Sequence, residues 1–262
     1  MKNVGLLTDF GSKDNFVGVM KAIILNINPH TNFVDITHDI LAQDVFSAAF
    51  LMLNSYRFFP KDTVFLSVVD PGVGSARKAL IIKTKNYIFI GPDNGILSLA
   101  AKEDGIEKIV AIENKKYFFK NVSSTFHGRD IFAPVCGWVL KNVNLKKFGP
   151  QVKTIKNLSI AQPKVSQDII SAEIIYIDRF GNLITNISLE TFKKFATDAN
   201  FCLQINNMEI SEFFDYYSQS YSNRPFLTKG SFGYVEIAVK NSSASDYLRA
   251  FVGHKFKIIR NR

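Results

Sequence analysis

Cysteine and histidine are scarce in this chain of 262 residues, which contains two of the first and four of the second. Cys136 and Cys202 lie far apart, and neither has a histidine beside it at the spacing of metal ligands. Disulfide frameworks and zinc sites are built from regularly spaced sets of such residues. The sequence therefore favours neither a disulfide framework nor a metal site, and we expect both cysteines to be small, buried apolar side chains.

Long apolar runs are also missing, because no segment approaches the ~18 uninterrupted apolar residues of a membrane-spanning helix. The first apolar stretch is short, meets Asp9 and lacks the small-residue pattern of a cleaved signal peptide. We therefore expect a cytoplasmic protein without a membrane partner.

Long basic runs are absent as well, although Lys and Arg exceed Asp and Glu by 32 to 23 and the net charge is +9. The basic residues are scattered as short pairs, such as Lys115-Lys116 and Lys193-Lys194, and are not interleaved with aromatic residues. Binding to nucleic acid is one interpretation of this charge. A solvated surface is the favoured one, so we expect no nucleic acid partner.

What the chain does contain is enough apolar and aromatic residues, 47% and 13%, to bury a substantial core. Its first part alternates strand-like and helical patterns, and Asp14 stands where it could cap the first helix. Strands are expected at 4–8, 33–36, 63–69, 79–83 and 87–90, and helices at 14–28, 44–58, 96–101 and 131–140. This alternation predicts an α/β domain with a mostly parallel central sheet.

A domain boundary is expected near residue 160, where Pro150, Pro163 and many polar residues interrupt any regular period. The predicted domains are therefore 1–160 and 161–262. The second domain has strand-like patterns with little helix between them, at 169–177, 201–205, 233–239 and 255–259. We expect a smaller, β-rich domain.

Polar clusters in the first domain are the candidates for a site. The run 124–130 surrounds His127 with hydroxyl and charged side chains. Asp9 and Asp70 each begin a loop that follows an expected strand, and Arg77 ends the loop that begins at Asp70. In open α/β sheets, ligands bind beyond the carboxyl ends of strands. The clusters predict one composite active site. Two alternatives remain: Asp9 could only bind backbone amides of its own turn, and Asp70 and Arg77 could form an ion pair that only braces their loop.

The strongest polar signal in the second domain is the segment Asp178-Arg179-Phe180-Gly181-Asn182. Its Asp and Asn side chains can hydrogen-bond a ribose, an amide or a carboxylate, while the Phe ring packs on a flat base. A β-turn in which these side chains bind only local backbone groups is the alternative. The segment 231–241 alternates as a half-buried strand.

Several of these motifs occur together and in order along almost the whole chain: Thr8-Asp9-Phe10-Gly11, Val69-Asp70-Pro71-Gly72-Val73-Gly74, Gly91-Pro92-Asp93-Asn94-Gly95, His127-Gly128-Arg129-Asp130, Asp178-Arg179-Phe180-Gly181-Asn182 and Gly233-Tyr234-Val235-Glu236-Ile237-Ala238. In this combination the chain resembles the S-adenosylmethionine (SAM) hydroxide adenosyltransferases, which are SAM hydrolases related to the fluorinase and chlorinase enzymes. The resemblance implies an N-terminal α/β domain and a C-terminal, barrel-like β domain. It also implies a homotrimer whose active sites lie between the N-terminal domain of one subunit and the C-terminal domain of the next.

The resemblance further implies hydrolysis of SAM to adenosine and L-methionine by attack of water on C5′, without a cofactor or a metal. Asp70, Arg77 and His127 would form the catalytic set, and Asp9 would hold the ribose hydroxyls. The remaining implied contacts come from the second domain: Asp178, Phe180 and Asn182 near the methionine end or the sugar, and Tyr217, Ser231, Glu236 and Val239 near the adenine.

Two other functions stay open on the sequence. One is a SAM-dependent halogenase of the chlorinase type. Such enzymes lack the Asp-Arg-His set, and they have an extra loop that this chain does not have between Thr84 and Gly95. A non-catalytic protein could bind adenosine or SAM without consuming either. Hydrolysis is the favoured function, and the family suggests a preference for the (R)-sulfonium form.

Overall fold

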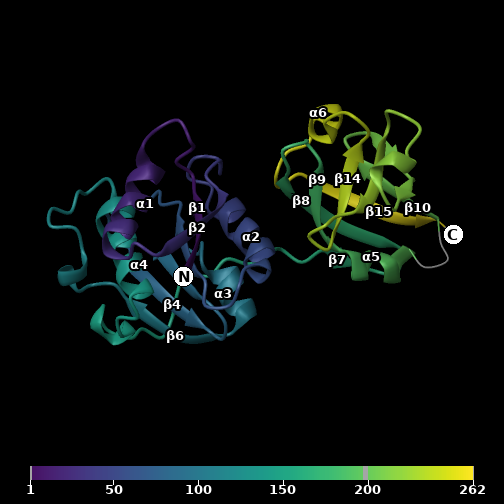
Figure 1. Ribbon diagram of the computed structural model, residues 1–262. Helices are drawn as coiled ribbons and strands as arrows, with labels where there is room; N and C mark the ends of the chain where they lie inside the picture. The colour runs from purple at the N-terminus through teal and green to yellow at the C-terminus, as the bar shows by residue number, and fades with distance from the viewer. Residues whose placement is uncertain (1, 197–199, 262) are drawn as a thin grey trace. The chain divides into compact units, whose positions relative to one another are not determined.

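A six-stranded sheet lies at the centre of the first of two units in the computed structural model, which describes residues 2–196 and 200–261 (Figure 1). The units are Met1–Ser159 and Ile160–Arg262. The strands of the first unit are β1 (Lys2–Thr8), β2 (Thr31–Thr37), β3 (Val64–Val68), β4 (Ala79–Thr84), β5 (Ile88–Pro92) and β6 (Ile106–Ala111), in the order β2-β1-β3-β5-β4-β6. The first four strands in that order are parallel, and β4 is antiparallel to both neighbours. The predicted α/β domain with a mostly parallel sheet is confirmed.

Four helices cover this sheet, two on each face (Figure 1). They are α1 (Phe16–Ile27), α2 (Val45–Ser55), α3 (Ser98–Asp104) and α4 (Ala133–Leu140). Side chains alternate along β3, so that Leu66 packs toward the α1 and α4 side while Phe65 stacks on Phe89 on the other. Cys136 lies in the α4 core, fully buried as expected.

Two helix starts differ from the sequence prediction. Asp14 does not cap α1, because the helix begins only at Phe16 and its N-cap is Asn15, which makes no capping bond. The third helix begins at Ser98 rather than near residue 96, because the side chain of Asn94 accepts a hydrogen bond from the N–H of Ile96 and holds a turn there. Asp44 caps α2 by accepting from the N–H of Ser47.

The second unit is a nine-stranded, mostly antiparallel sheet that curls into a half-barrel, so a β-rich C-terminal domain is confirmed. Its strands are β7 (Lys164–Val165), β8 (Ile169–Ile177), β9 (Leu183–Ser188), β10 (Asn200–Ile205), β11 (Met208–Ile210), β12 (Phe213–Phe214), β13 (Pro225–Lys229), β14 (Tyr234–Val239) and β15 (Lys255–Asn261). Two short helices, α5 (Leu189–Ala196) and α6 (Ala244–Leu248), accompany them. In the described part of the chain, no helix has the length and apolar character needed to cross a membrane.

Candidate active site

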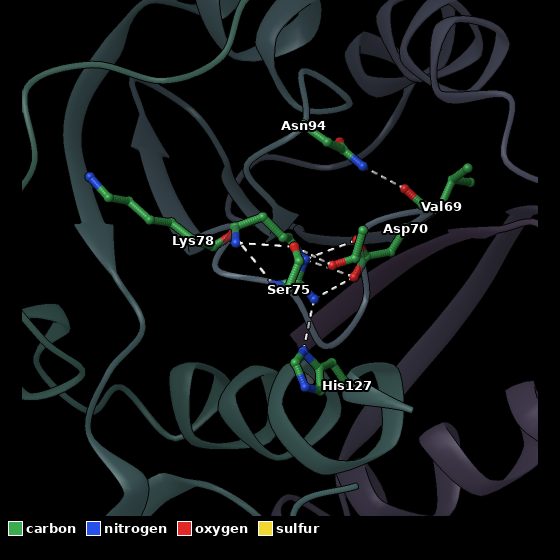
Figure 2. A network of polar contacts seen from close by, with 8 residues as sticks. Val69, Asp70, Ser75, Lys78, Asn94 and His127 are labelled. Carbon is green, nitrogen blue, oxygen red and sulfur yellow. Dashed lines mark hydrogen bonds and ion pairs between the residues drawn. The ribbon is translucent and has the colours of Figure 1, made fainter. Parts of the chain in front are cut away.

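Asp70, Arg77 and His127 meet in the first unit, although 50 residues separate Arg77 from His127 (Figure 2). Arg77 Nε lies 2.9 Å from each carboxylate oxygen of Asp70, and Nη2 also donates to Asp70 Oδ2. The same Nη2 lies 2.9 Å from His127 Nδ1. The side chains of Asp70 and Arg77 are only 6% and 8% exposed, so the guanidinium is fixed between an anion and an imidazole in a largely water-free place.

The loop after β3 holds Asp70 and Arg77 at this distance by its own hydrogen bonds. Ser75 Oγ donates to the carbonyl oxygen of Gly72 over 2.7 Å and accepts from the N–H of Arg77 over 3.2 Å. Asn94 Nδ2 donates to the carbonyl oxygen of Val69 over 2.7 Å, which ties the start of the loop to the turn after β5 (Figure 2). The loop 70–77 is therefore a closed, braced turn.

His127 stands at the head of a π-helical turn, Gly128–Phe132, that continues into α4. π-Helical turns occur frequently at functional sites. Asp130, fully buried, accepts from the N–H of Ser123 over 2.8 Å and from Arg129 Nε over 2.7 Å. Arg129 and Asp130 thus fasten the segment that carries His127 and do not join the Asp70–Arg77 pair.

The contact with Arg77 decides the protonation of His127. A guanidinium only donates hydrogen bonds, so Nδ1 of His127 must accept, and a neutral ring carries its proton on Nε2. Burial lowers the pKa of His127, and the positive charge of Arg77 lowers it further, against the opposing charges of Asp70 and Asp130. The site therefore presents a neutral imidazole with a hydrogen-bond donor at Nε2.

Asp9, Asp70 and His127 line one cavity of about 350 Å³. Phe126 packs edge-on against both Phe10 and Phe16, which are tilted toward each other, at ring centroid distances of 5.1 to 5.7 Å. The complete lining is Asp9, Phe10, Phe16, Ala42, Gln43, Val68, Asp70, Pro71, Val73, Thr125, Phe126, His127 and Gly128. The cavity combines an apolar, aromatic wall with a few convergent polar groups, as ligand sites do.

Arg77 does not line that cavity, but it shares a smaller one of about 240 Å³ with His127. His127 thus lines both cavities. Arg77 affects the larger cavity only through Asp70 and His127, which it positions by its hydrogen bonds. Asp9 is fixed differently, since its Oδ2 accepts from the N–H of Gln43 over 2.9 Å. That partner lies 34 residues away, so the expected alternative of a local turn role near Gly11 does not describe Asp9.

The second unit places Asp178, Phe180 and Asn182 in the turn between β8 and β9. Asp178 Oδ1 accepts from the N–H groups of Phe180 and Asn182 over 2.8 and 2.9 Å, and Oδ2 accepts from Asn182 Nδ2 over 2.8 Å. This local role was the alternative left open for the segment. Phe180 is 76% exposed, so its ring stands free on the outside of the turn.

Tyr217 and Glu236 form a second polar pair in this unit, in which Tyr217 Oη donates to Glu236 Oε2 over 2.9 Å. Burial raises the pKa of Glu236, and the nearby charge of Asp178 raises it further. Strand pairing puts Glu236 opposite Ile184, two residues after Asn182, so Glu236 lies near the end of the turn that carries Asn182. Ser231 is exposed in the turn before β14, and the side chain of Val239 lies instead in the hydrophobic core, on the opposite face of the strand from Glu236.

Two residues at the site escaped the sequence analysis, His38 and Gln43. His38 contacts Thr8, and Gln43 lines the larger cavity and binds Asp9 through its backbone. His38 follows β2 as Asp9 follows β1, so the rule about strand ends pointed to it. Within residues 2–196 and 200–261, no group of three or more His, Cys, Asp and Glu side chains is placed to hold a metal ion.

Comparison with known families covers both units. The family model of the SAM hydroxide adenosyltransferase N-terminal domain matches residues 4–149, and that of the corresponding C-terminal domain matches residues 172–257.

Three individual proteins illustrate the similarity. A Methanocaldococcus jannaschii protein named (R)-S-adenosyl-L-methionine hydrolase is 38% identical over 201 residues, which are 74% of this chain and 71% of that protein. A fluorinase from an Actinoplanes species is 27% identical over 218 residues, 73% of each chain. The crystal structure of a conserved protein from Thermotoga maritima superposes with a TM-score of 0.91 at 36% identity, over 98% of this chain and 100% of that one.

Proposed function

Because this chain belongs to the SAM hydroxide adenosyltransferase family, we propose that it hydrolyses SAM to adenosine and L-methionine. The observation that carries the proposal is the contact of Asp70, Arg77 and His127 beside an aromatic-walled cavity. The relatives named hydrolases also reach higher identity than the relative named fluorinase. SAM is the substrate, and we propose that neither a cofactor nor a metal takes part.

The chemistry sets a specific demand on the site. When water attacks C5′, the C5′–S bond breaks and its electron pair stays on sulfur, so methionine leaves as a neutral thioether that needs no proton. The nucleophile is the difficulty, because water has a pKa of ~15.7 and is a weak nucleophile until a proton is drawn from it. The site therefore has to orient a water, accept its proton and stabilise the negative charge that develops on oxygen.

The geometry divides these tasks among the three side chains. The carboxylate of Asp70 faces the cavity and keeps lone pairs beyond those that Arg77 occupies, so Asp70 is the proposed proton acceptor. Because His127 Nδ1 already accepts a hydrogen bond from Arg77, it cannot take the proton of the water, and the proposed role of His127 is to donate a hydrogen bond from Nε2 to the attacking oxygen. Arg77 supplies positive charge and fixes both partners, which a planar, bidentate guanidinium does better than an ammonium group.

Substrate binding draws on both units under this proposal. Asp9 binds the ribose hydroxyls, Asp178, Phe180 and Asn182 meet the methionine end or the sugar, and the adenine lies near Tyr217, Ser231, Glu236 and Val239. The part-buried contact between Tyr217 and Glu236, and the exposed ring of Phe180, support such a surface. For Val239, whose side chain lies in the core, only a backbone contact fits.

We further propose that the enzyme is a cytoplasmic homotrimer whose active sites combine the first unit of one subunit with the second unit of the next. We also propose a preference for the (R)-sulfonium form, because several relatives carry that name.

One incubation tests the proposed function. The purified protein is mixed with each SAM diastereomer, with and without chloride, and the products are separated by chromatography. Adenosine and methionine in equal amounts are expected, with faster release from the (R)-form. Formation of 5′-chloro-5′-deoxyadenosine would instead establish halogenation, and binding without any product would leave a non-catalytic SAM-binding protein.

A further inference from the structure

The loops that follow β1 and β2 are joined by hydrogen bonds outside the sheet ladder. Thr8 Oγ1 lies 2.8 Å from His38 Nδ1, and the N–H of Gly11 donates to the carbonyl oxygen of His38 over 2.8 Å. Asp9 lies between these two anchors. The β1–β2 register shifts between Leu6 and Leu7, so the regular pairing of the two strands ends just before the contact between Thr8 and His38.

The 38–43 segment also supplies the partner of the Asp9 carboxylate. Gln43 has a φ of +70°, in the left-handed region that residues with a side chain rarely adopt. Such strain persists where the surroundings hold it and is concentrated at functional sites. Here it directs the N–H of Gln43 to Asp9 Oδ2, while the next residue, Asp44, caps α2. The carboxylate is thus held by a backbone group whose position depends on the whole segment.

The His38 ring is held by a hydrogen bond at Nδ1 and lies beside a carboxylate at Nε2. Thr8 Oγ1 accepts from the N–H of Phe10 over 3.3 Å, which leaves the hydroxyl proton to be donated to His38 Nδ1. The other ring nitrogen, Nε2, lies 3.2 Å from Asp35 Oδ1. Although burial acts to raise it, the pKa of Asp35 is lowered by its hydrogen bond to Lys21 and by the nearby His38, so this carboxylate stays charged beside the ring, where Nε2 has no well-aligned hydrogen-bond partner.

The geometry does not suit nucleophilic catalysis by Thr8. A hydroxyl, an imidazole and a carboxylate lie in sequence, but Thr8 is only 1% exposed and lines neither of the two cavities beside His127. His38 lines neither cavity as well. The chain of contacts ends on the loop that carries Asp9.

We infer that His38 is a positioning residue, which acts through the Thr8 and Gly11 contacts to hold the Asp9 carboxylate where it binds the ribose hydroxyls. The inference rests on the proposed role of Asp9 in adenosine binding. His38 itself touches no substrate, so its loss affects the ground-state affinity for the nucleoside and leaves the water-activating side chains in place.

Adenosine titrations by calorimetry test the inference on the full-length protein. His38→Ala is expected to weaken adenosine about tenfold, the scale of one lost charge-assisted hydrogen bond, and to raise KM for SAM with kcat unchanged. His38→Asn keeps a hydrogen-bonding atom near the position of Nδ1 and is expected to restore most of the affinity. His30→Ala, an exposed histidine just before the same strand, is the matched control and should bind as the wild type does.

A double-mutant cycle with Asp9→Ala identifies the path of the effect. The His38→Ala/Asp9→Ala double variant should bind adenosine no more weakly than Asp9→Ala alone, and additive losses would overturn the inference. Full affinity in His38→Ala would overturn it as well. If His38→Ala does not fold, Thr8→Val removes the same contact and takes its place. Because adenosine binding is measured without turnover, a wild type that binds adenosine but releases no product contradicts only the proposed hydrolysis.

Discussion

Arg77 is the side chain that joins the other two members of the candidate catalytic set, since it bonds both Asp70 and His127. Arg77→Ala is expected to lower kcat by about 100- to 1,000-fold, the effect of losing a preorganised charged donor, with adenosine affinity largely retained. Arg77→Lys should lose nearly as much, because an ammonium group cannot make the forked contact. Adenosine release measured by chromatography gives kcat, and calorimetry gives the affinity.

The matched control is Arg57→Ala, which removes an exposed arginine that pairs with Glu103 at the surface. Its turnover should equal that of the wild type. Wild-type turnover in Arg77→Ala would remove Arg77 from the mechanism.

The protonation of His127 predicts the acid side of the pH profile. Its pKa is lowered from 6.5 by burial and by the charge of Arg77. The neutral ring therefore persists below pH 6.5, and only at lower pH does protonation of Nδ1 break the contact with Arg77. Turnover should fall as the pH drops through this lowered pKa, so the midpoint of the acid limb should lie below pH 6.5. An acid limb with an apparent pKa above 6.5, in rates at saturating SAM, would contradict this assignment.

The sequence could predict those functional residues that act through their side chains, because the residue type indicates the chemistry. It could not predict residues that act through their backbone. Asp70, Arg77 and His127 were singled out as residues of chemically capable types near strand ends, and the structure brings them together; their catalytic roles remain a prediction. Gln43 could not be found in this way, because it holds Asp9 through its backbone N–H in a left-handed conformation. Such a role leaves no trace in the residue type.

At the scale of elements, two loops must fit together for the site to form. Gly74 has a φ of +78°, and a Cβ there would lie 2.4 Å from the carbonyl oxygen of Ser124, in the segment leading to His127. Gly74→Ala is therefore expected to cost about 1–2 kcal/mol for the left-handed backbone and more for the clash. Because the two loops must separate, kcat should fall together with the free energy of unfolding.

Gly253→Ala separates the two contributions. Gly253 has a φ of +89°, but a Cβ there meets no atom within 4 Å, so only the backbone cost applies. Urea denaturation should show a smaller loss in Gly253→Ala than in Gly74→Ala, and activity should be unchanged. Equal losses in the two variants would show that the packing of the loop 70–77 against Ser124 contributes nothing.

Elements with a clear apolar period were predicted well, and those with buried polar residues were not. The strands β1 to β5 and helix α2 match their expected ranges closely, whereas β6 was not predicted. In contrast, no strand was predicted at β9, where Thr185 and Asn186 interrupt the apolar pattern. Both are buried and bonded, Thr185 to the carbonyl oxygen of Val235 and Asn186 to that of Ala161. Tertiary partners of this kind are invisible to a local period.

At the scale of the whole molecule, the candidate residues are divided between two units, each with its own hydrophobic core. The first unit holds Asp9 and the Asp70–Arg77–His127 contacts, and the second holds the Asp178 turn and the Tyr217–Glu236 pair. The proposed reaction needs both sets. Whether they come from one chain or from two neighbouring subunits is therefore a property of the assembly, and it is open to genetic complementation.

Co-expression of two inactive variants tests the proposed trimer. One chain carries Arg77→Ala in the first unit and the other carries Glu236→Ala in the second. If each site combines units of neighbouring subunits, random assembly places an intact first unit beside an intact second unit in about a quarter of the sites, so about a quarter of the wild-type activity should return. If each site is built from one chain, every site carries one defect and the mixture should be as inactive as its parts.

The control pair places both defects in the same unit, Arg77→Ala in one chain and Asp70→Ala in the other. Every first unit is then defective, so no assembly can restore activity, whatever its symmetry. Light scattering establishes the mass of each assembly, which should be that of three chains. A trimeric mass without any recovery in the first pair would place each active site within a single subunit, and recovery in the control pair would show that Asp70 and Arg77 are not both required at one site.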